Sequence, residues 1–203
     1  MKSILVLYAH PAPRHSKTNK ELAKVAQATE GVTFVDLYAQ YPRFKINIDK
    51  EQEQLLAHDI IIFQFPLMWY STPSILKEWQ DLVLEYGFAY GEGGKALEGK
   101  CLFPVVSVGG PETAYGEDGY NNFELRTFLT PLEQTAKLCS MKFLPPLALY
   151  SSLRSHKDGR LEDHVAHYAA LLSALKNDKF DYKAASARQL LIEGDLPLIG
   201  ETA

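Results

Sequence analysis

Residues 4–19 read ILVLYAHPAPRHSKTN, and the whole chain can be interpreted outward from this stretch. Its first five residues are apolar without interruption, which is typical of a parallel strand that is covered on both faces. A polar loop follows, and Leu22, Val25 and Ala26 then recur at the spacing of a helix. The stretch predicts a strand, a loop and a helix, which together form the first unit of an alternating α/β fold.

The alternation of strand and helix continues along the chain. Apolar runs predict strands at 33–35, 60–63, 101–108 and 141–144, and helical patterns predict helices at 49–56, 73–86, 130–138 and 165–175. Residues 49–52 and 130–133 each resemble a capping box, although the second of these helices could instead start at Phe123 and be kinked at Pro131. Residues 1–178 are expected to form one domain, and no structure is assigned to the tail at 179–203.

Five strands that alternate with helices predict a doubly wound parallel sheet with helices on both faces. Two strand orders of this class compete, and the loops have to distinguish them. In both orders, ligands bind beyond the carboxyl ends of the strands. The loops that follow the strands are therefore where a site is expected.

The composition argues against several classes of protein. The 203 residues carry 21 Lys and Arg against 25 Asp and Glu, so a general nucleic-acid binder is not expected. Cys101 and Cys139 stand alone, which argues against a disulfide framework and fits a reducing cytoplasm. No segment approaches the roughly 20 apolar residues needed to span a bilayer. We expect a cytoplasmic protein that reaches the inner face of the cell membrane only through a partner.

Two features suggest chemistry that we do not predict. His164 and His167 lie one helical turn apart beside Glu162 and Asp163, as metal ligands sometimes do. Because no third and fourth ligands are evident, we interpret them as part of a solvated helix face and predict no metal site. Cys139, at a helix end, is interpreted as a small buried hydrophobic residue.

The loop after the first strand contains no glycine, so it lacks the G-x-G-x-x-G pattern of nicotinamide-binding folds. Ser16, Lys17, Thr18 and Asn19 instead place hydroxyl, amide and backbone donors at the start of a helix. A helix N-terminus favours a phosphate group. The alternative is that Ser16 only caps the helix.

The loop after the third strand carries Pro66, Leu67, Met68, Trp69 and Tyr70. Its prolines stiffen the backbone, and rigid N–H groups beside aromatic faces suit a flat heteroaromatic ring. The alternative is that Trp69 packs under the following helix as part of the core.

The loop after the fourth strand begins with Ser107, Val108, Gly109 and Gly110 and continues to Tyr115. Paired glycines allow a close approach of backbone to a ligand, and the Tyr115 hydroxyl could donate a hydrogen bond. The alternative is a flexible connection.

In the strand order 2-1-3-4-5, the first, third and fourth strands are neighbours, so these three loops converge on one crevice. Phosphate donors, an aromatic loop and a glycine-lined wall then form a mononucleotide site of the kind that flavin mononucleotide (FMN) needs.

The same loops resemble a known family. The residues in question are Ala9-His10-Pro11 with Ser16 and Asn19, Phe65-Pro66-Leu67-x-Trp69-Tyr70 with Pro73-x-x-Leu76-Lys77-x-Trp79, and Gly109-Gly110. They are similar to the flavodoxin-like NAD(P)H:quinone oxidoreductases. Segments 36–42, 87–91 and 131–133 look most like the ancillary proteins of glutathione-gated potassium-efflux (Kef) systems. The resemblance extends over about residues 2–175.

The resemblance implies a flavodoxin-like fold and a bound flavin, FMN in preference to FAD. His10 and residues 16–19 would hold the phosphate, residues 67–70 would pass along the isoalloxazine ring, and residues 107–110 would line its other side. In longer members of the family, a Tyr and a His six residues later assist charge relay. Tyr115 matches the Tyr but Asn121 stands at the second position, so Tyr115 is a catalytic candidate only.

The implied activity is ping-pong hydride transfer from NAD(P)H to the flavin and then to a quinone, in a homodimer. The alternative is a regulatory subunit that docks on a membrane potassium-efflux transporter, with or without its own turnover.

Overall fold

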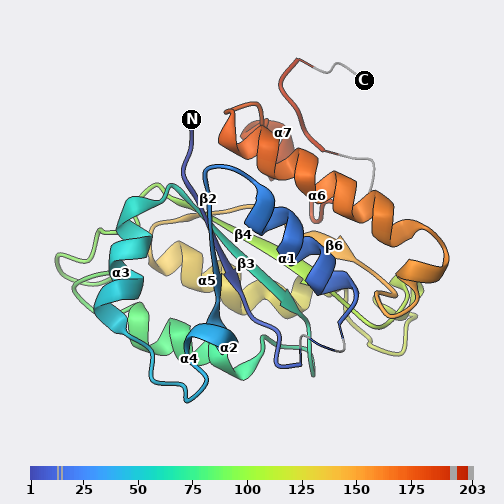
Figure 1. Ribbon diagram of the computed structural model, residues 1–203, viewed down its shortest axis with the longest axis horizontal. Coiled ribbons are helices and arrows are strands. Elements are labelled where there is room, and N and C mark those ends of the chain that lie inside the picture. The colour runs from blue at the N-terminus through green and yellow to red at the C-terminus, as the bar shows by residue number, and fades with distance from the viewer. Residues whose placement is uncertain (13, 15, 193–195, 201–203) are drawn as a thin grey trace.

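The computed structural model describes residues 1–12, 14, 16–192 and 196–200. Its core is one parallel sheet with the strand order β2-β1-β3-β4-β5, and β6 also pairs with β4 (Figure 1). The strands are β1 (Ile4–Tyr8), β2 (Val32–Asp36), β3 (Ile60–Pro66), β4 (Cys101–Ser107), β5 (Lys142–Phe143) and β6 (Leu147–Leu149). The predicted doubly wound order 2-1-3-4-5 is confirmed.

Helices cover both faces of this sheet, as predicted (Figure 1). One face packs against α1 (Thr18–Ala28), α6 (Arg160–Lys176) and the short α7 (Tyr182–Ser186). The other packs against α2 (Leu37–Gln40), α3 (Ile48–Ala57), α4 (Ser74–Val83) and α5 (Thr130–Leu138). None of the helices in the described part of the chain has the length and apolar character that crossing a membrane requires.

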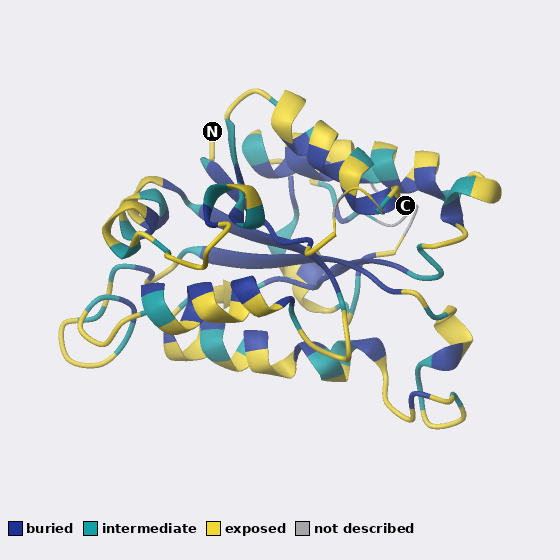
Figure 2. Ribbon diagram, turned by 60° about the horizontal axis from the view of Figure 1, so that its bottom comes forward, coloured by how far each residue is buried: buried dark blue, intermediate teal, exposed yellow. Residues whose placement is uncertain are grey.

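Alternation along each strand divides the core into two layers. In β1, Ile4 and Val6 pack with the α1 and α6 layer, whereas Leu5 and Leu7 pack with the α3 and α4 layer. Because successive side chains of a strand point to opposite faces, an uninterrupted apolar run is what a two-sided core requires. Figure 2 shows the buried sheet between helices whose outer faces are exposed.

A buried carboxylate joins three elements of the second layer. Glu51 is fully buried in α3. Its Oε1 accepts hydrogen bonds from the Tyr41 hydroxyl at 2.7 Å and from Gln40 Nε2 at 2.8 Å, and its Oε2 accepts one from Trp79 Nε1 at 2.9 Å. A buried carboxyl group is stable only with such partners. The hydrogen bonds from Tyr41 and Trp79 therefore stabilise the fold at this position.

The two predicted capping boxes are wrong. In α3 the capping residue is Asn47, whose Oδ1 accepts a hydrogen bond from the backbone N–H of Lys50 at 3.1 Å. In α5 no side chain caps the N-terminus, and Glu133 pairs instead with Arg126 and Lys137. A 3₁₀ turn at Leu125–Leu129 leads into this helix, so the alternative start at Phe123 is also wrong.

The predicted fifth strand at 141–144 is shorter in the structure, and a strand that was not predicted, β6, follows it. β5 and β6 both pair with β4, and Pro145 and Pro146 separate them. A proline has no N–H to donate to a neighbouring strand, which explains the break. As a result the sheet has an additional carboxyl end at Leu149, beside those of β3 and β4.

Part of the chain at 179–192 and 196–200 packs on the same face as α1 and α6. Phe180 and Leu191 are fully buried there, and Leu191 forms a parallel bridge with Leu147 at the end of the sheet. The chain beyond the last long helix therefore contributes to the core.

Candidate functional site

A cavity of about 460 Å³ lies at the carboxyl ends of β1, β3 and β4. Ten of the predicted residues line it: His10, Ser16, Lys17, Thr18, Asn19, Pro66, Leu67, Met68, Ser107 and Gly109. Ala12, Ser152, Leu153 and His156 complete the lining. Trp69, Tyr70, Val108, Gly110 and Tyr115 were predicted but are not part of this lining. The volume is within the range of small-molecule sites, so the three loops meet in a cavity that could hold a cofactor.

The first loop brings a helix N-terminus to the cavity. Ser16 Oγ accepts a hydrogen bond from the backbone N–H of Asn19 at 3.1 Å, so Ser16 caps α1 and also lines the cavity. His10 Nδ1 accepts a hydrogen bond from the Ala12 N–H at 3.1 Å. Burial lowers the pKa of His10, with Asp36 acting in the opposite direction. The imidazole is therefore neutral with its proton on Nε2, the nitrogen that remains free to donate.

Hydrogen bonds among buried side chains fix the first and third loops relative to each other. Asn19 Nδ2 donates to Ser107 Oγ at 2.7 Å. Beneath this pair, Gln64 Nε2 donates to the Asn19 carbonyl at 3.3 Å, and the Tyr168 hydroxyl donates to Gln64 Oε1 at 3.1 Å. Asn19 Oδ1 is buried and has no partner in the described chain. Since unpaired buried oxygens are unfavourable, this atom is where a bound ligand could supply a donor.

The second loop is a tight hairpin with two aromatic residues at its tip. Met68 and Ser71 exchange backbone hydrogen bonds at 3.0 and 3.1 Å. Trp69 and Tyr70 both have left-handed backbones, with φ of 49° and 63°. The Trp69 side chain is 93% exposed, so the interpretation of Trp69 as a core residue is wrong. The buried tryptophan of the chain is Trp79.

Tyr70 is held against the segment that follows the third loop. Its ring lies 5.0 Å from that of Phe128, centroid to centroid, and its hydroxyl donates to Asn121 Oδ1 at 3.2 Å. Asn121, which replaces the relay histidine of the resembling family, is therefore engaged with Tyr70. Tyr115 packs against Phe128 and Tyr150, and burial raises its pKa.

The two glycines of the third loop differ in the space around them. A Cβ on Gly109 would meet only Leu153, at 4.0 Å, so space remains on the cavity side of this residue. A Cβ on Gly110 would lie 2.9 Å from the hydroxyl of Tyr120, an exposed side chain that would have to shift to make room for it. Val108 is buried in the core layer beneath, which leaves only its backbone near the loop surface.

A fourth loop, at residues 150–157, was missed by the sequence reasoning. It follows β6, and the backbone N–H groups of Ser151 and Ser152 donate to Gly110 O at 2.8 Å and to Val108 O at 2.9 Å. Ser152, Leu153 and His156 line the cavity. The only signal was the apolar run Leu147-Ala148-Leu149 after two prolines, which marks a strand end at this edge.

The other charged or nucleophilic candidates lie outside this cavity. Among the residues that the structure describes, no three His, Cys, Asp or Glu side chains are grouped as metal ligands. His164 is buried in α6, so its assignment to a solvated helix face is wrong. The interpretation of Cys139 as a small buried residue is confirmed.

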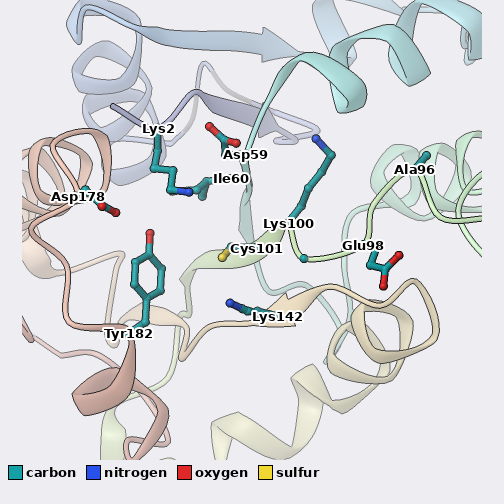
Figure 3. Close-up of a pocket in the computed structure, with 11 residues that line it drawn as sticks. Lys2, Asp59, Ile60, Ala96, Glu98, Lys100, Cys101, Lys142, Asp178 and Tyr182 are labelled. Carbon is teal, nitrogen blue, oxygen red and sulfur yellow. The ribbon is translucent and has the colours of Figure 1, made fainter.

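A second cavity, of about 490 Å³, lies at the opposite edge of the sheet, where β1, β3 and β4 begin (Figure 3). Some of its charged groups form hydrogen bonds that stabilise the fold. Lys100 Nζ donates to the carbonyl oxygens of Leu56 and His58 at 3.1 and 2.7 Å, and Asp59 Oδ2 accepts from the Ser3 N–H at 2.9 Å. Ligands of doubly wound sheets bind at the carboxyl ends of the strands, so the first cavity is the candidate site.

Comparison with known proteins agrees with this geometry. The family described as having a flavodoxin-like fold matches residues 2–172. The chain belongs to this family. A curated relative from Serratia proteamaculans, named glutathione-regulated potassium-efflux system ancillary protein KefG, is 47% identical over 165 residues, which cover 81% of this chain and 90% of the relative.

Two solved structures resemble this member of the flavodoxin-like family closely. General stress protein 14 from Treponema denticola, in complex with FMN, is 37% identical with a TM-score of 0.80 and covers 85% of this chain and 99% of its own. An NADPH-quinone reductase from P. pentosaceus is 33% identical with a TM-score of 0.74 and covers 82% of this chain and 95% of its own.

Proposed function

We propose that this flavodoxin-like chain is a flavin-dependent oxidoreductase that binds FMN and transfers hydride from NAD(P)H to a quinone. The observation that carries the proposal is the cavity at the carboxyl ends of β1, β3 and β4, lined by residues from all three predicted loops. The FMN complex of one structural relative and the quinone reductase name of another support the same chemistry.

The residues of the cavity fit a flavin phosphate at one end. Ser16, Lys17 and Thr18 lie at the N-terminus of α1, where the helix dipole favours a phosphate. His10 adds an Nε2 proton to this end. Asn19 holds the α1 end against Ser107, so it positions the two loops and leaves Oδ1 for a polar group of the ligand.

The other end of the cavity fits a flat ring. Pro66, Leu67 and Met68 form one wall, and Leu67 is fixed because its N–H donates to the Ser107 carbonyl at 2.9 Å. Gly109 provides a wall without a side chain. Bound flavin would supply the two-electron chemistry, while the chain orients the ring and stabilises the charge that develops on it. Val108, Trp69, Tyr70 and Gly110 would act around this ring through backbone or rim contacts.

The visible spectrum of the purified protein tests this proposal. We expect flavin absorption, either as purified or after incubation with FMN or FAD, and release of FMN on denaturation. The loaded protein should oxidise NADH or NADPH in the presence of a small quinone. A colourless protein that takes up neither flavin would overturn the proposal, and release of FAD would correct the cofactor.

A second role is supported by the names of the curated relatives, which are ancillary proteins of a potassium-efflux system. In that role the chain would dock on a membrane transporter from the cytoplasmic side, as a homodimer and with or without turnover. Potassium efflux from vesicles containing the transporter should increase when the flavin-loaded chain is added. Quinone reduction without any effect on efflux would leave the enzyme as the sole function.

A further inference from the structure

The fourth loop is built against the helix N-terminus where we place the flavin phosphate. Thr18 Oγ1 donates to the Ser152 carbonyl at 3.1 Å and lies 3.3 Å from Ser155 Oγ. Ser155 Oγ also donates to the Ser152 carbonyl at 2.9 Å, and Ser155 is fully buried. These bonds hold residues 152–156 at the end of the cavity that is formed by Ser16, Lys17 and Thr18.

His156 follows this anchor directly and lines the cavity. Its Nδ1 is buried without a hydrogen-bond partner among the residues that the structure describes. A proton on Nδ1 would be a buried donor with no acceptor, which favours a proton on Nε2 instead. His58 differs, because its two ring nitrogens are engaged by Gln54 O at 2.6 Å and Thr33 Oγ1 at 2.7 Å. His156 is thus free to bind a ligand.

We infer that His156 is a phosphate-binding residue, whose Nε2–H donates to the phosphate of FMN beside the N-terminus of α1. The inference rests on the proposed function. It extends the site to an element that none of the three predicted loops contains. It also assigns a specificity: the cavity distinguishes a phosphorylated flavin from riboflavin, which has the same ring and ribityl chain without the phosphate.

The test compares two ligands on the full-length protein after flavin removal. Affinities for FMN and riboflavin are measured by quenching of flavin fluorescence in the wild type, His156→Gln and His156→Arg. For His156→Gln we expect FMN binding to weaken roughly 10- to 100-fold, as for loss of a hydrogen bond to a charged group, with riboflavin affinity unchanged. His156→Arg should restore the preference for FMN.

Lys157→Gln is the matched control, because Lys157 is the next residue, is basic and exposed, and does not line the cavity. It should leave both affinities close to those of the wild type. Riboflavin binding also reports whether each variant is folded.

The possible results distinguish a failure of the inference about His156 from a failure of the proposed flavin binding. If His156→Gln lowers neither affinity, or lowers both equally, His156 does not bind the phosphate, although the chain still binds flavin. Equal affinity of the wild type for FMN and riboflavin would likewise show that no residue of the cavity, His156 included, selects for the phosphate. If the wild type binds neither ligand, the proposed function itself is overturned, and the inference with it.

Discussion

At the scale of single residues, His164 is the side chain whose environment differs most from what its sequence neighbours suggest. It is 1% exposed, and neither ring nitrogen has a hydrogen-bond partner in the described part of the chain. Burial lowers its pKa to about 4, and the nearby His167 acts in the same direction. The folded protein therefore holds this imidazole in the neutral form well below the pH at which a free histidine takes up a proton.

This burial predicts a loss of stability in mild acid. Between pH 6.5 and about 4 the unfolded chain binds a proton at His164 that the folded chain does not bind. The free energy of unfolding should therefore fall by about 1.4 kcal/mol for each pH unit below 6.5, with the loss complete near pH 4. Urea unfolding of the wild type and of His164→Leu at several pH values measures the effect.

Because leucine does not titrate, the difference in unfolding free energy between the two proteins should change with pH over this window. The lowered carboxyl pKa values of Asp59 and Glu133 add a loss of stability that begins near the acidic end of this window, and this loss is common to both proteins. Parallel pH curves for the wild type and His164→Leu would show that His164 takes up its proton at the same pH in the folded and the unfolded chain, so that its pKa is not lowered by burial.

At the scale of elements, the hairpin between β3 and α4 combines exposure with an unfavourable backbone. Two-residue turns with left-handed φ at both central positions favour Asn and Gly, and bulky residues there are costly. Trp69 and Tyr70 occupy these positions, directly after Met68, which lines the cavity. Because such strain is usually retained for function, we expect this pair to contribute more to binding the substrate than to the stability of the fold.

Trp69→Asn should therefore stabilise the protein by about 1 kcal/mol while it impairs the reaction. In the flavin-loaded protein we expect a higher KM for the quinone with FMN affinity nearly unchanged. Tyr70→Asn is the matched comparison, since it relieves a similar φ but loses the Phe128 contact and the hydrogen bond to Asn121. Unfolding free energies that fall equally in both variants would contradict the assignment of strain to Trp69.

The elements also show how far the sequence alone could predict this molecule. Uninterrupted apolar runs at 4–8 and 60–63 specify strands buried on both faces, and the loop residues then place the site at one edge of the sheet. Those signals are local, so the strands and the three predicted loops follow from them. The strand order 2-1-3-4-5 follows only from the further requirement that the three loops meet at one crevice. The ten predicted residues that line the cavity belong to these loops.

What the sequence could not predict depends on contacts between distant segments. The strand at 141–144 is interrupted by prolines and resumes as β6, and this continuation creates the loop that carries His156. Glu51 and His164 have the sequence context of surface residues, yet packing of α3 on α4 and of α6 on the sheet buries them. Helical periodicity records which face is apolar but not which polar side chain is enclosed with it.

At the scale of the whole molecule, the chain after α6 completes the layer that covers one face of the sheet. Phe180 is fully buried, and its ring lies 6.2 Å from Phe103 in β4 and 5.2 Å from Tyr182, measured between centroids. Farther along, the Leu191 N–H donates to Pro146 O at 2.8 Å, and the Ala148 N–H donates to Leu191 O at 3.1 Å. The family match ends at residue 172, so these contacts join a segment outside the matched region to strands inside it.

If this segment folds together with the sheet, removing one of its buried rings should weaken the entire protein. We expect Phe180→Ala to lower the unfolding free energy by about 3–5 kcal/mol, the usual effect of deleting a buried aromatic side chain. Ile199→Ala, in the same segment but 61% exposed, should change it by no more than about 0.5 kcal/mol. Urea unfolding followed by far-UV circular dichroism and by tryptophan fluorescence measures both.

The two signals also show whether the segment unfolds together with the sheet. The buried Trp79 lies on the opposite face of the sheet, so a coincident shift of the two signals in Phe180→Ala would mean that the segment and both layers unfold as one cooperative unit. A separate early transition for the segment, with the fluorescence midpoint unchanged, would mean instead that residues after 178 are an appendage on a sheet that is stable without them.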